Sequence, residues 1–132
     1  MSRIPRFVEH LKTGFTAEAV SAARCRAFAA RAERDGLPNL GARWRKLALA
    51  KDALAVELLE AADQIRGAAT DVATALSEER YENDILYPKM IRDVDGPTAA
   101  VLEKVVAAQK EHAKALGALR SELGASQGDV AA

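Results

Sequence analysis

Two glutamates, Glu79 and Glu82, stand three residues apart in the second half of the chain, and a histidine, His112, follows them. Residues three apart share one face of a helix, so both carboxylates face the same way. Glu79 also continues an apolar stripe, which favours an interior position over a surface ion network around Arg80. A buried carboxylate needs a cation, hydrogen-bond donors or protonation. His112 by itself is typical of a surface or core histidine on an amphipathic helix.

Helices must position these side chains, and the spacing of apolar residues predicts an all-α chain. A first helix is expected over residues 6–35, with Gly36 as its stop. Pro38 suits the first turn of a second, antiparallel helix, and Phe28 and Trp44 are expected to anchor the core. A last helix is expected over residues 97–123, followed by a flexible tail over residues 124–132.

The middle of the chain keeps one helical phase over a long distance. Steps of four and three residues connect an uninterrupted series: Leu58, Ala62, Ile65, Ala69, Val72, Leu76 and Glu79. The series passes through Gly67, and a single glycine costs a helix only about 1 kcal/mol. The pattern therefore predicts two helices fused end to end over residues 38–94, with a kink at Pro88.

Composition excludes several classes of function. Lys and Arg total 19, as do Asp and Glu, so no net charge attracts nucleic acid or an anionic membrane. The single cysteine, Cys25, excludes an intrachain disulfide and a Cys-x-x-Cys electron-transfer module, and it is expected to be an inert, small apolar residue. We find no signal peptide or membrane-spanning stretch, and we expect a cytoplasmic protein.

Three segments resemble the rubrerythrin family of ferritin-like proteins. Residues 11–18 and 28–36 look like its first helix, with Phe15 three residues before Glu18. The run Glu79-Arg80-Tyr81-Glu82, with the following Tyr87-Pro88, resembles its third helix, and residues 109–113 resemble its fourth. The resemblance implies one ferritin-like four-helix bundle domain over residues 1–123.

In that family, glutamates and histidines of the four helices hold two irons. Gln109 stands where the resemblance implies a glutamate, and Lys51 and Leu54 stand where it implies a glutamate and a histidine. An ammonium is no metal ligand, and an amide is at most a weak one, so an intact di-iron centre is not expected. Four metal ligands remain by this correspondence: Glu18, Glu79, Glu82 and His112.

If these glutamates and Lys51 all face one interior, the interior carries net negative charge. A divalent cation, protonated carboxylates or inward-turned arginines such as Arg24 and Arg80 can neutralise it. We expect Lys51 to point into the interior and to pair with at least one glutamate. The alternative is a solvated lysine whose stem lies along the bundle.

The resemblance implies a metal-binding protein with one divalent ion, iron or manganese, or with none. The oxidoreductase or peroxide chemistry of that family would need a separate electron donor here, because we find no iron–sulfur module in the sequence. The alternative is a non-catalytic, dimeric scaffold or regulator in which Lys51, Leu54 and Gln109 complete a metal-free network. No catalytic residue is assigned.

Chain length also predicts a homodimer. Positions 51 and 79 are 28 residues apart, which spans about 42 Å as continuous helix, so both cannot serve one site in one chain. We expect a domain-swapped dimer with two composite sites. The alternative is a sharp turn near Gly67 and an up-down-up-down monomer.

Overall fold

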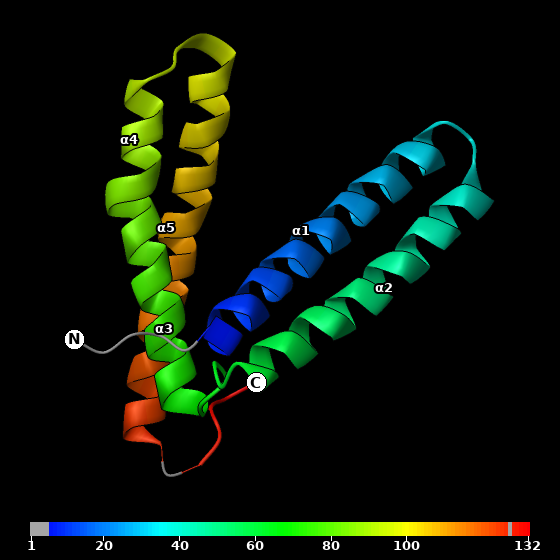
Figure 1. Ribbon diagram of the computed structural model, residues 1–132. Helices are drawn as coiled ribbons and strands as arrows, with labels where there is room; N and C mark the ends of the chain where they lie inside the picture. Colours follow the sequence, from blue (N-terminus) through cyan, green and yellow to red (C-terminus); the bar gives the residue numbers. More distant parts are fainter. Residues whose placement is uncertain (1–5, 127) are drawn as a thin grey trace. The chain divides into compact units, whose positions relative to one another are not determined.

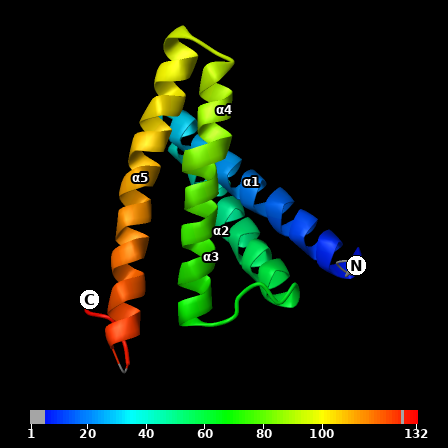
Figure 2. The ribbon, with the colours of Figure 1, turned by 90° about the vertical axis from the view of Figure 1, so that its left-hand side faces the viewer.

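The chain is all-α, and its helices form two hairpins (Figures 1 and 2). The structure, a computed structural model, describes residues 6–126 and 128–132. It divides into two compact units, the first ending at Ile65 and the second beginning at Arg66. We call them hairpin 1 and hairpin 2. The single four-helix domain over residues 1–123 stays a prediction.

Hairpin 1 consists of α1 (Arg6–Arg34) and α2 (Pro38–Ala61). Gly36 ends α1 as expected, because its φ of 77° is left-handed, and the N–H of Leu37 donates to the carbonyl of Ala32 at 2.9 Å. Pro38 then occupies the first position of α2, where its missing N–H costs nothing.

Small residues fill the contact between α1 and α2. They recur every three, four or seven residues, as in a coiled-coil seam: Ala22, Cys25, Ala29 and Ala32 on α1, and Gly41, Ala48 and Ala55 on α2. A Cβ added to Gly41 would lie 2.9 Å from Cγ of Glu33. Cys25 is buried in this seam, as expected of a small apolar residue.

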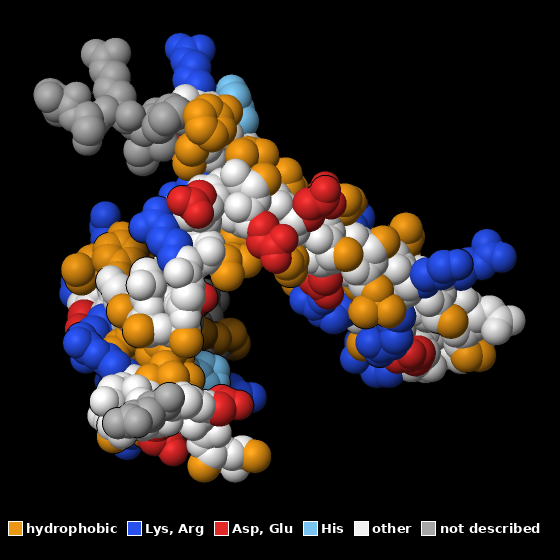
Figure 3. All heavy atoms as spheres, turned by 90° about the horizontal axis from the view of Figure 1, so that it is seen from below, with side chains coloured by type: hydrophobic (Ala, Val, Ile, Leu, Met, Phe, Trp, Pro, Cys, Tyr) orange, Lys and Arg blue, Asp and Glu red, His pale blue; other side chains and the backbone are white. Residues whose placement is uncertain are grey.

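Large apolar side chains line the flank of this seam and remain accessible. Leu40, Leu47 and Leu54 are 45–49% exposed and form what we call the apolar row. Figure 3 shows hydrophobic side chains reaching the surface along this elongated hairpin. Phe28 packs edge to face on Trp44 at 5.1 Å but is 47% exposed, so its predicted role as a core anchor is wrong within hairpin 1.

Hairpin 2 pairs one long helical segment with α5 (Gly96–Ala125). The segment consists of α3 (Ala68–Tyr81), the π-helix η1 (Glu82–Leu86) and α4 (Tyr87–Arg92). The N–H of Tyr87 donates to the carbonyl of Glu82, five residues back, which widens the turn just before Pro88. The backbone therefore accommodates Pro88 with a π-helix. Helix α5 includes Gly124 and Ala125, and the flexibility of the tail stays a prediction.

The predicted fusion of the second and third helices is wrong, because residues 62–67 are not helical. Asp63 takes a left-handed φ of 57°, and the N–H of Gln64 donates to the carbonyl of Leu59, which closes the end of α2. At the start of α3, the carboxylate of Asp71 accepts from the N–H groups of Arg66 and Gly67. Capping at both ends thus outweighs the unbroken apolar phase.

Candidate functional site

Hairpin 1 contains an ion pair between two of the positions singled out in the sequence. Lys51 Nζ on α2 lies 3.4 Å from Glu18 Oε2 on α1, and the two side chains are 31% and 28% exposed. Glu18 stands four residues before the buried Ala22, and Lys51 three residues after the buried Ala48, so both continue the alanine seam. The expected pairing of Lys51 with a glutamate is confirmed.

Leu54, which stands where the resemblance implies a histidine, belongs to the apolar row. With Leu11, Glu57, Leu58 and Ala61, it lines an open hollow of about 340 Å³ that Glu18 also lines. One side of Glu18 thus faces an ammonium and another faces hydrocarbon. Removing Lys51 would therefore leave the charged carboxylate of Glu18 beside apolar side chains, which is unfavourable.

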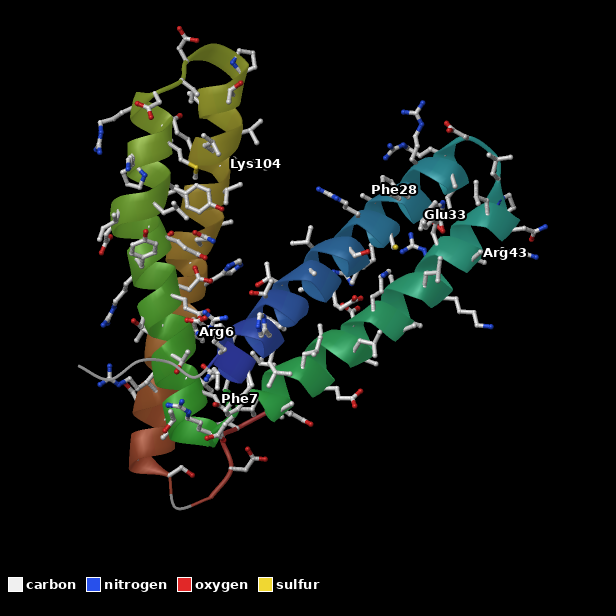
Figure 4. All side chains as sticks on the ribbon, viewed as in Figure 1. Arg6, Phe7, Phe28, Glu33, Arg43 and Lys104 are labelled. Carbon is white, nitrogen blue, oxygen red and sulfur yellow. The ribbon has the colours of Figure 1, made fainter. Side chains whose placement is uncertain are left out.

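Two further ion pairs, both about half exposed, connect α1 to α2. Arg26 Nη1 lies 2.7 Å from Asp52 Oδ2, and Arg45 binds both carboxylate oxygens of Glu33 at 2.6 and 3.0 Å. Figure 4 shows Glu33 on α1 near the turn of the hairpin. The hydrogen bonds from Arg45 lower the pKa of Glu33, and those to Glu33 raise the pKa of Arg45.

Hairpin 2 contains a second polar contact at predicted ligand positions. Gln109 Nε2 on α5 donates a hydrogen bond of 2.8 Å to Glu82 Oε2 at the start of η1. In each hairpin, therefore, a polar residue at a position where the resemblance implies a ligand binds a carboxylate that was predicted as a ligand. We call the group around Glu82 and Gln109, together with Glu79 and Asn83, the polar layer of hairpin 2.

Three oxygens of the polar layer are buried and accept no hydrogen bond from any residue within 6–126 or 128–132: Glu79 Oε2, Asn83 Oδ1 and Gln109 Oε1. Asn83 is 7% exposed, the one buried polar residue in the described part of the chain. Sequence reasoning missed it. The available signal was its place four residues after Glu79, which continues the series that runs from Leu58 through Val72 and Leu76.

His112 lies on α5, one turn beyond Gln109, and is exposed. Among the described residues, no group of three or more His, Cys, Asp or Glu side chains has an arrangement that could hold a metal ion. A metal centre of the rubrerythrin type therefore does not fit either hairpin by itself. The convergence of Glu18 with Glu79, Glu82 and His112 in one interior stays a prediction.

The fold and the polar contacts define an all-α protein of two helical hairpins, each with polar residues within its helix contact. Comparison with known proteins yields no match to a family model, a curated protein or a solved structure. The resemblance to rubrerythrin thus rests on the sequence segments quoted above. In the part of the chain described, no helix has the length and apolar character needed to cross a membrane.

Proposed function

We propose that the chain is a non-catalytic, rubrerythrin-like scaffold or regulatory protein that acts as a homodimer. Lys51 binds Glu18, and Gln109 binds Glu82, so side chains of the protein satisfy carboxylates that in the family would bind metal. This observation carries the proposal. Polar contacts inside a helix seam stabilise one register over others, which is their best-attested structural role.

The apolar row supports the dimer. Leu40, Leu47 and Leu54 follow one another at seven-residue spacing, and each is nearly half exposed. Large apolar surfaces of this kind mark protein interaction sites. We assign the row to contacts with a second copy of the chain.

The short connection between the hairpins supports an exchanged, ferritin-like dimer. Ferritin-like bundles run their second and third helices parallel, which requires a crossover as long as the bundle. The 24 residues of α2 span about 36 Å, whereas the six residues 62–67 reach about 20 Å when fully extended. One chain cannot complete this arrangement alone. In the exchanged dimer, Glu18 and Lys51 of one copy face Glu79, Glu82 and His112 of the other.

Light scattering of the purified protein tests the proposal. A dimeric mass at micromolar concentration is expected, and Leu47→Lys in the apolar row should shift the mass toward the monomer. Leu49→Lys is the matched control, because Leu49 is 72% exposed and lies outside the row. A monomeric wild type, or equal effects of the two substitutions, would refute the dimer.

A second candidate function is metal-dependent redox chemistry with one iron or manganese ion. It is favoured by Glu79, whose Oε2 is buried and accepts no hydrogen bond from the residues described. In this case a separate electron donor would serve the protein. Peroxide consumption by the iron-loaded protein tests it, and the absence of turnover above that of free iron would rule it out.

A further inference from the structure

An open hollow lies beside the contact of α3 and η1 with α5, and most of the charge around it is positive. Its volume is about 390 Å³, and its charged side chains are those of Arg80, Asp84, Lys110 and Lys114. Arg80 and Asp84 are four residues apart on the long helical segment, and Lys110 and Lys114 are four residues apart on α5. Residues four apart share one face of a helix, so the two helices bring three cations to one side of hairpin 2.

The cations of this hollow are not neutralised by the residues that the structure describes. Asp84 is the one carboxylate among the lining residues, which leaves an excess of two positive charges. Arg80 and Lys110 form neither an ion pair nor a hydrogen bond within the described part of the chain. Lys114 lies 3.2 Å from Glu111, but both side chains are at least 70% exposed, where such a pair contributes little. The excess charge is therefore available to an anion.

Asn83, in the π-helix η1, adds a hydrogen-bond donor to the wall of the hollow. It is only 7% exposed, and its buried Oδ1 accepts no hydrogen bond from residues 6–126 or 128–132. Its Nδ2 also forms no hydrogen bond with those residues, but unlike Oδ1 this atom is not buried. The NH₂ group of Asn83 is therefore the end of the amide that faces the hollow. Because buried amides are normally hydrogen-bonded, an acceptor is expected here.

The carboxylates at predicted ligand positions lie outside this hollow. Glu82 is two residues from Arg80 and two from Asp84, and residues two apart do not share a helix face. Neither Glu79 nor Glu82 lines the hollow, and Glu82 accepts its hydrogen bond from Gln109. In the proposed exchanged dimer, Glu79 and Glu82 face the second copy. The hollow is therefore separate from that contact and remains accessible in the dimer.

We propose that this hollow binds a small organic phosphate through the dianionic group of a phosphate monoester. Two negative charges balance the two excess positive charges of the hollow. The guanidinium of Arg80 suits two phosphate oxygens at once, and Lys110 and Asn83 Nδ2 supply further donors. Leu76 and Ala113 form an apolar part of the wall, which suits the organic group, and sites for small molecules commonly have volumes in this range. The site lies within hairpin 2 and depends neither on the dimer nor on a metal.

Calorimetric titration of the full-length protein with phenyl phosphate tests the site. One molecule is expected to bind per chain, with a Kd of about 1 mM or tighter. Phenyl sulfate has nearly the same shape but a single negative charge, so it should bind at least about threefold more weakly. Inorganic phosphate lacks the ring that suits Leu76 and Ala113, so it should also bind at least about threefold more weakly.

Single substitutions of exposed charges locate the ligand in the hollow. Arg80→Met should weaken phenyl phosphate binding by at least about tenfold, because the phosphate loses its two-pronged donor. Lys104→Met is the matched control, because it removes the same charge from an exposed position on α5 that does not line the hollow (Figure 4). It should change the affinity by less than about twofold. Asp84→Asn removes the carboxylate of the hollow, so it should tighten binding by at least about threefold.

Four results would overturn the inference. They are a wild type that does not bind phenyl phosphate, equal affinity for phenyl sulfate or inorganic phosphate, equal weakening by Arg80→Met and Lys104→Met, and unchanged or weaker binding in Asp84→Asn. Arg80 and Asp84 are both exposed, so neither substitution removes a buried side chain, and circular dichroism of each variant checks its fold. The mass of the wild type in light scattering decides the dimer separately.

Discussion

The ion pair between Lys51 and Glu18 should contribute measurably to stability. At 3.4 Å, two unit charges attract by about 5 kcal/mol at an effective dielectric constant of about 20, and by about 1 kcal/mol in water. Side chains about 30% exposed lie between these limits, and holding the lysine in place costs up to about 2 kcal/mol. We therefore expect a coupling energy of about 1–1.5 kcal/mol, above the median of surface pairs and well below that of buried ones.

A double-mutant cycle measures this coupling. Lys51→Met preserves length and helix propensity, and it should lower the free energy of unfolding by about 1–2 kcal/mol because Glu18 loses its cation beside the apolar hollow. Glu18→Gln in the Lys51→Met background should then cost less than in the wild type. Urea unfolding with excess chelator is the assay. Additive effects, with no coupling, would refute the claim that Lys51 serves to neutralise Glu18.

Three further predictions concern other contacts between helices. Gln109→Leu should cost about 1–2 kcal/mol in urea unfolding with chelator, because the partly buried carboxylate of Glu82 loses its donor, and an unchanged midpoint would contradict this. Gly41→Ala should destabilise hairpin 1 by about 1–3 kcal/mol, because the new Cβ has a neighbour at 2.9 Å, whereas Gly117→Ala meets nothing within 4 Å and should stabilise. Arg45→Met should raise the pKa of Glu33 in an NMR titration, and an unmoved pKa would refute this. The substitution should also lower the free energy of unfolding at neutral pH. This difference between variant and wild type should disappear in acid, where Glu33 is protonated in both proteins.

Local signals predicted most of the helices. Gly36 and Pro38 placed the first turn because a left-handed glycine ends a helix and a proline suits the start of one. The run 93–97 likewise placed the turn before α5. The pairing of Lys51 with a glutamate followed from two steps: the resemblance placed Lys51 and the glutamates in one interior, and a partly buried carboxylate there needs a cation.

Other features depend on helix capping and on packing between helices, which the spacing of apolar residues does not reveal. The apolar phase continues through residues 62–67, but left-handed Asp63 and the capping carboxylate of Asp71 break the helix there. The seam of hairpin 1 uses alanines, so the aromatic Phe28 lies on the flank, contrary to its predicted role as a core anchor. Asn83 reads as an ordinary polar residue until the packing of η1 on α5 buries it.

We infer that Lys51 and Gln109 take the place of metal at Glu18 and Glu82, two positions that the resemblance to rubrerythrin marks as ligands. Elemental analysis of iron in protein purified without chelators tests this claim most directly. We predict iron well below one atom per chain in protein that is fully folded by circular dichroism, because an ammonium and an amide already satisfy Glu18 and Glu82. One or more irons for each chain would contradict this prediction.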